Sequence, residues 1–220
     1  MKIATWNIER LRHKARMRDI QLVCNQLQAD ILVLTETDEQ ICPDYKYSFY
    51  SAKLSDDERI VYRSTENRVS IYTNYECVRL HETYDPKTAL CVELITEHGN
   101  LVVYGTIIGI EGNRRKSFQQ DLSRQIEDFE HLSVNHSLCI CGDFNCSFCD
   151  NYYFTERGRD ALNQFFAQRK ITLLTRECKE CIDHIAVSED VIGKAQKQIY
   201  EWNLDKQLSD HKGISVTKIP

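Results

Sequence analysis

The first 35 residues of the chain place a helical segment between two strand-like runs. Lys2–Trp6 form a short strand-like run, and Ala15–Gln28 carry apolar side chains at helical spacing. Ile31–Thr35 is a continuous apolar run that is too short for a helix and suits a strand covered on both faces. A strand, a helix and a buried strand in this order form a βαβ unit with parallel strands. The sequence therefore predicts an α/β fold.

The rest of the chain contains more strand-like runs and two more helical patterns. Four runs separated by short polar segments read as consecutive antiparallel strands: Val69–Thr73, Glu76–Leu80, Leu90–Ile95 and Leu101–Ile108. Helical spacing recurs in Ser117–Leu132 and Thr155–Lys170, and further strands are predicted at Leu138–Cys141, Ile182–Val187 and Ile214–Lys218. About ten strands and three or four helices favour two packed mixed sheets flanked by helices over one doubly wound sheet.

The composition sets limits on the class of protein. The chain has 220 residues, of which 42% are hydrophobic and 28% are charged, so it can bury one sizeable core. We find no linker and no internal repeat, and we expect residues 1–220 to form one domain. The formal charge of -5 argues against a protein that coats nucleic acid through overall positive charge. A local basic patch is compatible with this charge.

The sequence also bears on the compartment. The longest apolar run, Leu101–Ile110, is shorter than the roughly 18 residues that a membrane helix needs. Polar residues follow the first methionine before a secretory apolar segment could form, so nothing there reads as a signal peptide. We therefore expect a cytoplasmic protein whose 10 cysteines are mostly reduced thiols.

Polar side chains gather at five places where predicted strands begin or end. These places carry Asn7 and Glu9, Glu36, Asp143 and Asn145, Asp183, and Asp210 and His211. In an α/β protein such strand ends can converge on one rim. Several carboxylates in one pocket repel one another unless a cation lies among them, and carboxylates with Asn and His suit Mg²⁺ or Mn²⁺. Such a site favours phosphate esters, because the metal polarises a phosphoryl oxygen.

The spacing of these residues suggests roles. Asp143 and Asn145 lie two apart on one strand face, where the carboxylate could orient and deprotonate a water molecule. His211 could be held by Asp183, stay cationic and meet the non-bridging phosphate oxygens. The alternative is that each strand-end Asp or Asn simply caps a turn. A serine-type catalytic triad at Ser209-Asp210-His211 is disfavoured, because adjacent side chains point in different directions.

The ordered set resembles the endonuclease/exonuclease/phosphatase superfamily of metal-dependent phosphoesterases. That superfamily includes abasic-site endonucleases, pancreatic-type deoxyribonucleases and inositol polyphosphate 5-phosphatases. The matching motifs run from Trp6-Asn7-Ile8-Glu9 through Gly142-Asp143-Phe144-Asn145 to Ser209-Asp210-His211. The resemblance implies a four-layered α/β sandwich of two mixed sheets flanked by helices, in agreement with the pattern of strands and helices above.

The resemblance also implies roles for individual residues. Glu36 would be the principal ligand of the divalent metal, with Asp210, Asn7 and Glu9 helping to hold the ion or its waters. Asp143 would position and activate the attacking water, and Asn145 would bind the phosphate. His211, paired with Asp183, would stabilise the pentacovalent phosphorus or the leaving oxygen.

Other residues bear on the choice of substrate. Many family members carry His or Tyr on the strand that matches residues 102–106, where the equivalent here is Thr106, with Tyr104 as the competing alignment. Arg115, within Arg114-Arg115-Lys116, is a second candidate for substrate contact, and the basic run from Arg10 to Arg18 could bind phosphate or be compensated by nearby acids. Tyr152 and Tyr153 could stack a base or pack in the core.

Cysteine pairs offer a further reading. Cys146 and Cys149, with Cys178 and Cys181, resemble two halves of a zinc site, although their separation exceeds the usual spacing. Small buried or incidental thiols are the alternative.

The leading hypothesis is a Mg²⁺- or Mn²⁺-dependent phosphoesterase that splits a P–O bond by in-line attack of water, with nucleic acid as its substrate. A phosphatase or phosphodiesterase acting on a small molecule or a lipid headgroup is the alternative enzyme. A cysteine hydrolase is a further possibility, although no feature selects its pair of residues. A binding module of the same fold without catalysis is the hypothesis from another class.

Overall fold

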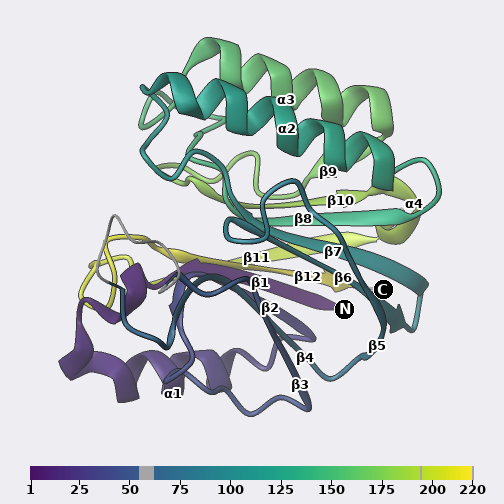
Figure 1. The fold of residues 1–220 in the computed structure, drawn as a ribbon. Coiled ribbons are helices and arrows are strands. Elements are labelled where there is room, and N and C mark those ends of the chain that lie inside the picture. The colour runs from purple at the N-terminus through teal and green to yellow at the C-terminus, as the bar shows by residue number, and fades with distance from the viewer. Residues whose placement is uncertain (55–61, 194, 220) are drawn as a thin grey trace.

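Two six-stranded sheets pack face to face and carry helices on their outer faces, as Figure 1 shows. The structure is a computed structural model that describes residues 1–54, 62–193 and 195–219. The first sheet has the order β11 (Gln196–Trp202), β12 (Gly213–Ile219), β1 (Lys2–Asn7), β2 (Ile31–Asp38), β4 (Glu66–Thr73) and β3 (Tyr47–Tyr50). The second has the order β5 (Glu76–His81), β6 (Ala89–Thr96), β7 (Gly99–Ile107), β8 (Ser137–Asp143), β10 (Asp183–Ser188) and β9 (Ile171–Leu173).

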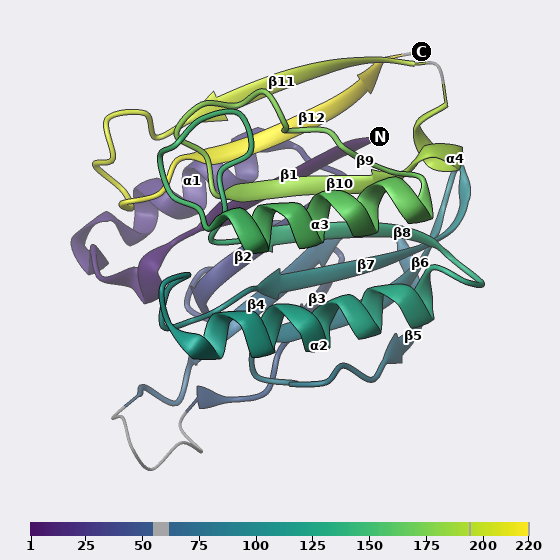
Figure 2. The same ribbon diagram turned by 90° about the horizontal axis from the view of Figure 1, so that it is seen from above.

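Helices complete the outer layers. α1 (Met17–Leu27) covers the first sheet, and α2 (Lys116–Leu132) and α3 (Glu156–Arg169) lie side by side over the second, as the view from above in Figure 2 shows. The short α4 (Glu189–Ile192) joins β10 to β11. The predicted four-layered α/β sandwich is confirmed. Among the helices that the structure describes, none has the length and apolar character needed to cross a membrane.

Three apolar clusters lie between the layers. The cluster between the sheets joins side chains such as Val33 and Val69 of the first sheet to Val103 and Ile185 of the second. A second cluster fills the space between the second sheet and helices α2 and α3, and a third lies under α1. Burial on both faces explains why strands such as β2 read as continuous apolar runs.

Strand directions place several strand ends at the same edge of the sandwich. β1 and β2 are parallel, as predicted, and pair from Ile3 with Ile31 to Asn7 with Thr35. β12 is antiparallel to β1 and therefore begins where β1 ends. In the second sheet β8 and β10 are antiparallel, and Asp143 pairs with Asp183. Since β1 packs against both β8 and β10, the two groups of strand ends meet.

The structure differs from the expected elements in a few places. Twelve strands are found in the described part of the chain, and three of them, β3, β9 and β11, were not predicted. The helix predicted at Ala15–Gln28 begins at Met17, because the preceding residues form two short 3₁₀ turns, η1 (Glu9–Leu11) and η2 (Lys14–Arg16). The other predicted elements are present with shifts of a few residues at their ends.

Gly142 allows close contact between β7 and β8 just before Asp143. Its φ is +139°, and a Cβ there would lie 2.1 Å from the carbonyl oxygen of Thr106. We expect Gly142→Ala to lower the free energy of unfolding by about 3 kcal/mol, measured by urea denaturation, because backbone must move. Gly99→Ala is the matched control, since Gly99 has φ +99° but no atom within 4 Å of the added Cβ. Equal losses in the two variants would contradict the steric explanation.

Candidate active site

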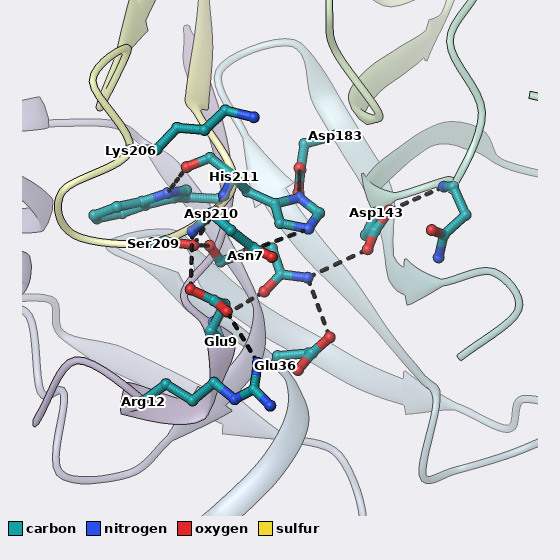
Figure 3. Close-up of polar contacts among 12 residues, drawn as sticks. Asn7, Glu9, Arg12, Glu36, Asp143, Asp183, Lys206, Ser209, Asp210 and His211 are labelled. Carbon is teal, nitrogen blue, oxygen red and sulfur yellow. Dashed lines mark hydrogen bonds and ion pairs between the residues drawn. The ribbon is translucent and has the colours of Figure 1, made fainter. Parts of the chain in front are cut away.

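The five polar strand ends meet in one cluster, shown in Figure 3. Asn7 ends β1 and lies at its centre. The Asn7 side-chain nitrogen donates to Oδ2 of Asp143 at 3.2 Å and lies 3.5 Å from Oε1 of Glu36. The Asn7 side-chain oxygen accepts the backbone N–H of Glu9 at 2.9 Å. This fully buried amide therefore links the two sheets at the site.

His211 and Asp183 form an ion pair on one side of the cluster. Nδ1 of His211 donates to Oδ2 of Asp183 at 2.6 Å, and its Nε2 lies 3.6 Å from Oδ1 of Asp210. Burial lowers the pKa of His211, but the charge and hydrogen bond of Asp183, with the charges of Asp143 and Asp210, outweigh it and raise the pKa to about 10. The imidazole is therefore cationic at neutral pH.

Asp143 faces the centre of the site from the end of β8. Its Oδ1 accepts the backbone N–H of Asn145 at 2.9 Å, and its Oδ2 accepts the Asn7 bond described above. Burial raises the pKa of Asp143, His211 opposes this, and the negative charges of Asp183 and Glu36 add to it, with a resulting pKa of about 7. A carboxyl group with a pKa near neutrality is suited to exchange a proton with a water molecule.

Asn145 lies beyond the end of β8 and adopts a left-handed backbone conformation, with φ +49°, so it does not share a strand face with Asp143 as the spacing predicted. Its side-chain nitrogen donates to the carbonyl oxygen of Ile108 at 3.0 Å and lies 3.4 Å from that of Gly109. Its own carbonyl accepts a bond from the side chain of Asn113 at 2.9 Å. The phosphate contact predicted for Asn145 would therefore require one of these backbone bonds to open.

Glu36 and Glu9 have different surroundings. The side chain of Glu36 is 31% exposed, and its Oε2 lies 3.3 Å from Nε of Arg10. Glu9 is buried, and its Oε2 accepts the backbone N–H of Asp210 at 2.8 Å. Arg12 and His13 lie 3.5 Å and 3.3 Å from its two carboxylate oxygens. Both oxygens of Glu9 are thus engaged, and they position the segment that carries Asp210.

The chemistry of the donors fits a hard divalent cation. Partial burial raises the pKa of Asp210 and the positive charge of His211 opposes this, while the negative charges of Glu9 and Glu36 raise it further. Oδ1 of Asp183 is buried and has no hydrogen-bond partner among residues 1–54, 62–193 and 195–219. These observations indicate an excess of negative charge that an added cation would relieve. In the same described ranges, no three His, Cys, Asp or Glu side chains already stand in a metal-binding arrangement.

The structure does not bring Thr106 into the cluster. Thr106 is fully buried in β7, and its hydroxyl group donates to Gln125 of α2 on the helix-covered face of the sheet. The competing residue Tyr104 lies on this same face and donates to Asp128 of α2. The prediction of a substrate contact at Thr106 is therefore corrected, because strand alternation turns its side chain away from the face that carries Asp143.

Arg115 is exposed at the start of α2. Its loop also carries Asn113, which bonds the carbonyl group of Asn145. A substrate contact by Arg115 stays a prediction.

Three residues that support the site were not singled out by sequence reasoning. Ser209 donates from Oγ to the carbonyl oxygen of Asn7 at 2.6 Å, and Trp6 donates from Nε1 to that of His211 at 3.0 Å. Asn203 donates to the carbonyl oxygens of Ser209 and His211 at 2.8 Å and 2.6 Å. Trp6 and Ser209 are adjacent in sequence to predicted site residues, and this position could have identified them. No sequence feature identifies Asn203.

Several other predicted features have structural partners. In the basic run, Arg16 pairs with Asp19 at 3.6 Å, so acids compensate part of its charge. The thiols of the two cysteine pairs are free. In the described part of the chain they do not form a group of three or more side chains that could hold a zinc ion.

A cavity of about 360 Å³ opens beside His211. Its lining includes Asp183, Asp210 and Tyr152. The ammonium group of Lys206 lies 3.1 Å from the hydroxyl group of Tyr152, at the rim of this cavity. The cavity therefore joins the polar cluster to a tyrosine and a cation that a substrate could contact.

Comparison with known proteins adds a family and a set of similar folds. The model of the Endonuclease/Exonuclease/phosphatase family matches residues 4–211. The 3′ phosphatase NExo from Neisseria, solved with a product DNA hairpin, has a TM-score of 0.72 at 17% identity, with 99% of each chain covered. An AP endonuclease from Archaeoglobus fulgidus has a TM-score of 0.69 at 15% identity, again with 99% of each chain covered.

A third similar structure is the endonuclease domain of TRAS1, a telomere-specific non-LTR retrotransposon. Its TM-score is 0.66 at 16% identity, with 99% of this chain and 97% of that chain covered. No curated protein matches the chain. At these identities the structural likeness establishes the fold.

Proposed function

Because the chain belongs to the endonuclease/exonuclease/phosphatase family, we propose that it is a divalent-metal-dependent phosphoesterase that hydrolyses phosphodiester bonds of nucleic acid by in-line attack of water. One observation carries this proposal: the Asp143 carboxylate and the cationic His211–Asp183 pair belong to one cluster, with Asn7 bonded to Asp143 within it. A carboxylate beside a cationic imidazole suits a reaction in which a proton leaves water while negative charge grows on the phosphorus oxygens.

Asp143 is the group proposed to orient and deprotonate the attacking water. Its carboxylate is held by the backbone N–H of Asn145 and the side chain of Asn7, so its orientation is fixed before substrate binds. A pKa of about 7 lets this group accept a proton at neutral pH and return it afterwards. Asn145 lies directly beside it and is proposed to contact the phosphate.

His211 is proposed to neutralise charge on the phosphorus oxygens. Asp183 fixes the ring through Nδ1, which leaves the Nε2 edge, 3.6 Å from Asp210, as the edge available to a ligand. An imidazolium that is already charged and oriented stabilises a pentacovalent transition state without reorganisation.

Glu36, Asp210 and Asn7 are the residues proposed to hold the cation, with Glu9 positioning Asp210. A bound Mg²⁺ or Mn²⁺ would supply a Lewis acid that polarises a phosphoryl oxygen and offsets its charge. The raised pKa values of Asp143 and Asp210, to which the charge of Glu36 contributes in both cases, support the assignment.

Nucleic acid is the proposed substrate because of what surrounds the cluster. Tyr152 and Lys206 lie at the cavity rim on one side, and Arg10 lies over the ring of Tyr62 on another. Tyrosine rings beside cations suit a strand that has both bases and phosphates. The similar structures include a DNA-bound 3′ phosphatase and two endonucleases, which supports a nuclease and makes removal of a terminal phosphate from nucleic acid the second candidate.

Two further expectations accompany this function. The family match over residues 4–211 supports one domain across residues 1–220. All ten cysteines are free thiols, which supports the reducing cytoplasm as the place of action.

The test is hydrolysis of a substrate panel by purified protein with Mg²⁺ or Mn²⁺. The panel comprises single-stranded DNA, duplex DNA with and without an abasic site, RNA, a 3′-phosphorylated oligonucleotide and phosphorylated metabolites. We expect nucleic acid to be cleaved, and EDTA or Glu36→Gln to lower the rate by about a thousandfold or more. Glu39→Gln is the matched control, because Glu39 pairs with Lys53 outside the cluster. Turnover of metabolites alone would reject nucleic acid as the substrate.

A further inference from the structure

Arg10 contacts a carboxylate that the proposed function assigns to the cation. Nε of Arg10 lies 3.3 Å from Oε2 of Glu36, and the two side chains are 28% and 31% exposed. The other carboxylate oxygen of Glu36 faces the side-chain nitrogen of Asn7 at 3.5 Å. The guanidinium group therefore occupies the carboxylate oxygen of Glu36 that an ion would otherwise contact.

The backbone of Arg10 is held in a conformation that favours glycine. Glu9, Arg10 and Leu11 have φ of +48°, +51° and +54°, a region that costs a residue with a side chain about 1 kcal/mol. The carbonyl oxygen of Arg10 accepts a bond of 2.6 Å from Nη2 of Arg63, which is itself paired with Asp38 and Glu66. The main chain at Arg10 is thus anchored through its carbonyl oxygen.

In the same conformation the guanidinium group also contacts an aromatic ring. The Arg10 guanidinium carbon is 5.4 Å from the centre of the Tyr62 ring, within the range of a cation–π contact. The ring and the Glu36 carboxylate therefore hold the guanidinium group together at the rim of the site. Arg68 contacts the same ring at 5.8 Å and donates to the Tyr62 hydroxyl group, which holds the ring in place.

We propose that Arg10 is the resident counter-ion of Glu36 and that a divalent cation must displace it, so that this side chain sets the affinity of the site for cations. This inference rests on the proposed function, because it assumes the cation site at Glu36. Electrostatic attraction favours the replacement of Arg10 by a divalent cation at Glu36. Arg10 is the single cation paired with Glu36 in the described chain, whereas a divalent ion would also attract the neighbouring carboxylates of Asp210 and Asp143.

The test measures binding of Mn²⁺ alone by isothermal titration calorimetry, without substrate. We expect Arg10→Gly to tighten Mn²⁺ binding about fivefold, which corresponds to the loss of one partly exposed competing ion pair. Glycine also suits the φ of +51° at this position, so the variant should fold. Arg10→Asn is the second variant, because asparagine tolerates the same backbone region. Glu36→Gln should abolish the binding and so locate it.

Arg16→Ala is the matched control. It removes the same charge from the same segment, but Arg16 pairs with Asp19 and does not contact Glu36. We expect its Mn²⁺ affinity to stay close to that of the wild type. Equal affinity of wild type, Arg10→Gly and Arg10→Asn, or equal tightening by Arg16→Ala, would overturn the role of Arg10 and leave the cation site standing. No Mn²⁺ binding in any variant would overturn the cation site and the exchange with it.

Discussion

Asp143→Asn is expected to lower kcat by about a thousandfold with little change in protein structure, because the amide cannot take a proton from the attacking water. The substitution keeps the shape of the side chain and an oxygen that can accept the Asn145 backbone N–H at 2.9 Å. The loss should appear at saturating substrate and cation, in single-turnover kinetics on the nucleic acid that the substrate panel selects. A small loss would reject Asp143 as the general base.

The same substitution should stabilise the cation-free protein, which separates chemistry from folding. The folded-state pKa of Asp143 is about 7, above the ordinary value of 3.8, so stability is lost as pH rises through this range because the folded protein holds the proton more tightly. Asparagine cannot ionise. In EDTA at about pH 8, urea denaturation should show that Asp143→Asn raises the free energy of unfolding by about 2 kcal/mol, after the lost bond to Asn7 is included. At about pH 4 this increase should vanish.

Asp128→Asn is the matched control for Asp143→Asn. Asp128 also has a pKa raised mainly by burial, but it lies on α2 and accepts a bond from Tyr104 far from the cluster on the opposite face of the sheet. The Asp128→Asn substitution should leave kcat unchanged. A thousandfold loss of kcat in Asp128→Asn as well would show that replacing a buried aspartate lowers activity by disturbing the fold. The loss in Asp143→Asn would then be no evidence for a general base.

The contrast between β2 and β11 explains which strands the sequence could predict. β2 is buried on both faces and appears in the sequence as the run Ile-Leu-Val-Leu-Thr. β11, with the sequence Gln-Lys-Gln-Ile-Tyr-Glu-Trp, lies at the edge of its sheet and has mostly exposed or half-buried residues. β3 and β9 are also edge strands and have only four and three residues. Pairing with a neighbour, and not an apolar pattern, forms these strands.

Site residues divide in a similar way. Asn7, Asp143 and His211 follow or precede apolar runs, so the edge on which they meet could be predicted from strand directions. The contact between Arg10 and Glu36 could not, because it depends on a turn with three positive φ angles. Thr106 was misassigned because one residue of strand register decides which face a side chain occupies.

Asp183→Asn is expected to change the pH dependence of the reaction as well as its rate. Asp183 provides the largest of the contributions that raise the pKa of His211 to about 10 against the effect of burial. Without the carboxylate charge this pKa should fall well below 10, so the imidazole loses its proton as pH rises. At about pH 8.5 we expect a loss of about a thousandfold in kcat/KM, because a neutral ring no longer stabilises the phosphorus oxygens.

The shape of the pH profile distinguishes this role from a structural one. Between about pH 6 and pH 9 the activity of Asp183→Asn relative to the wild type should fall steadily, because His211 in the wild type keeps its charge over this range with a pKa of about 10. Asp205→Asn removes the same charge from the exposed segment between β11 and β12 and should follow the wild-type profile. A purely structural role for Asp183 would lower activity equally at every pH. Parallel profiles would therefore refute the proposal that Asp183 acts by keeping His211 cationic.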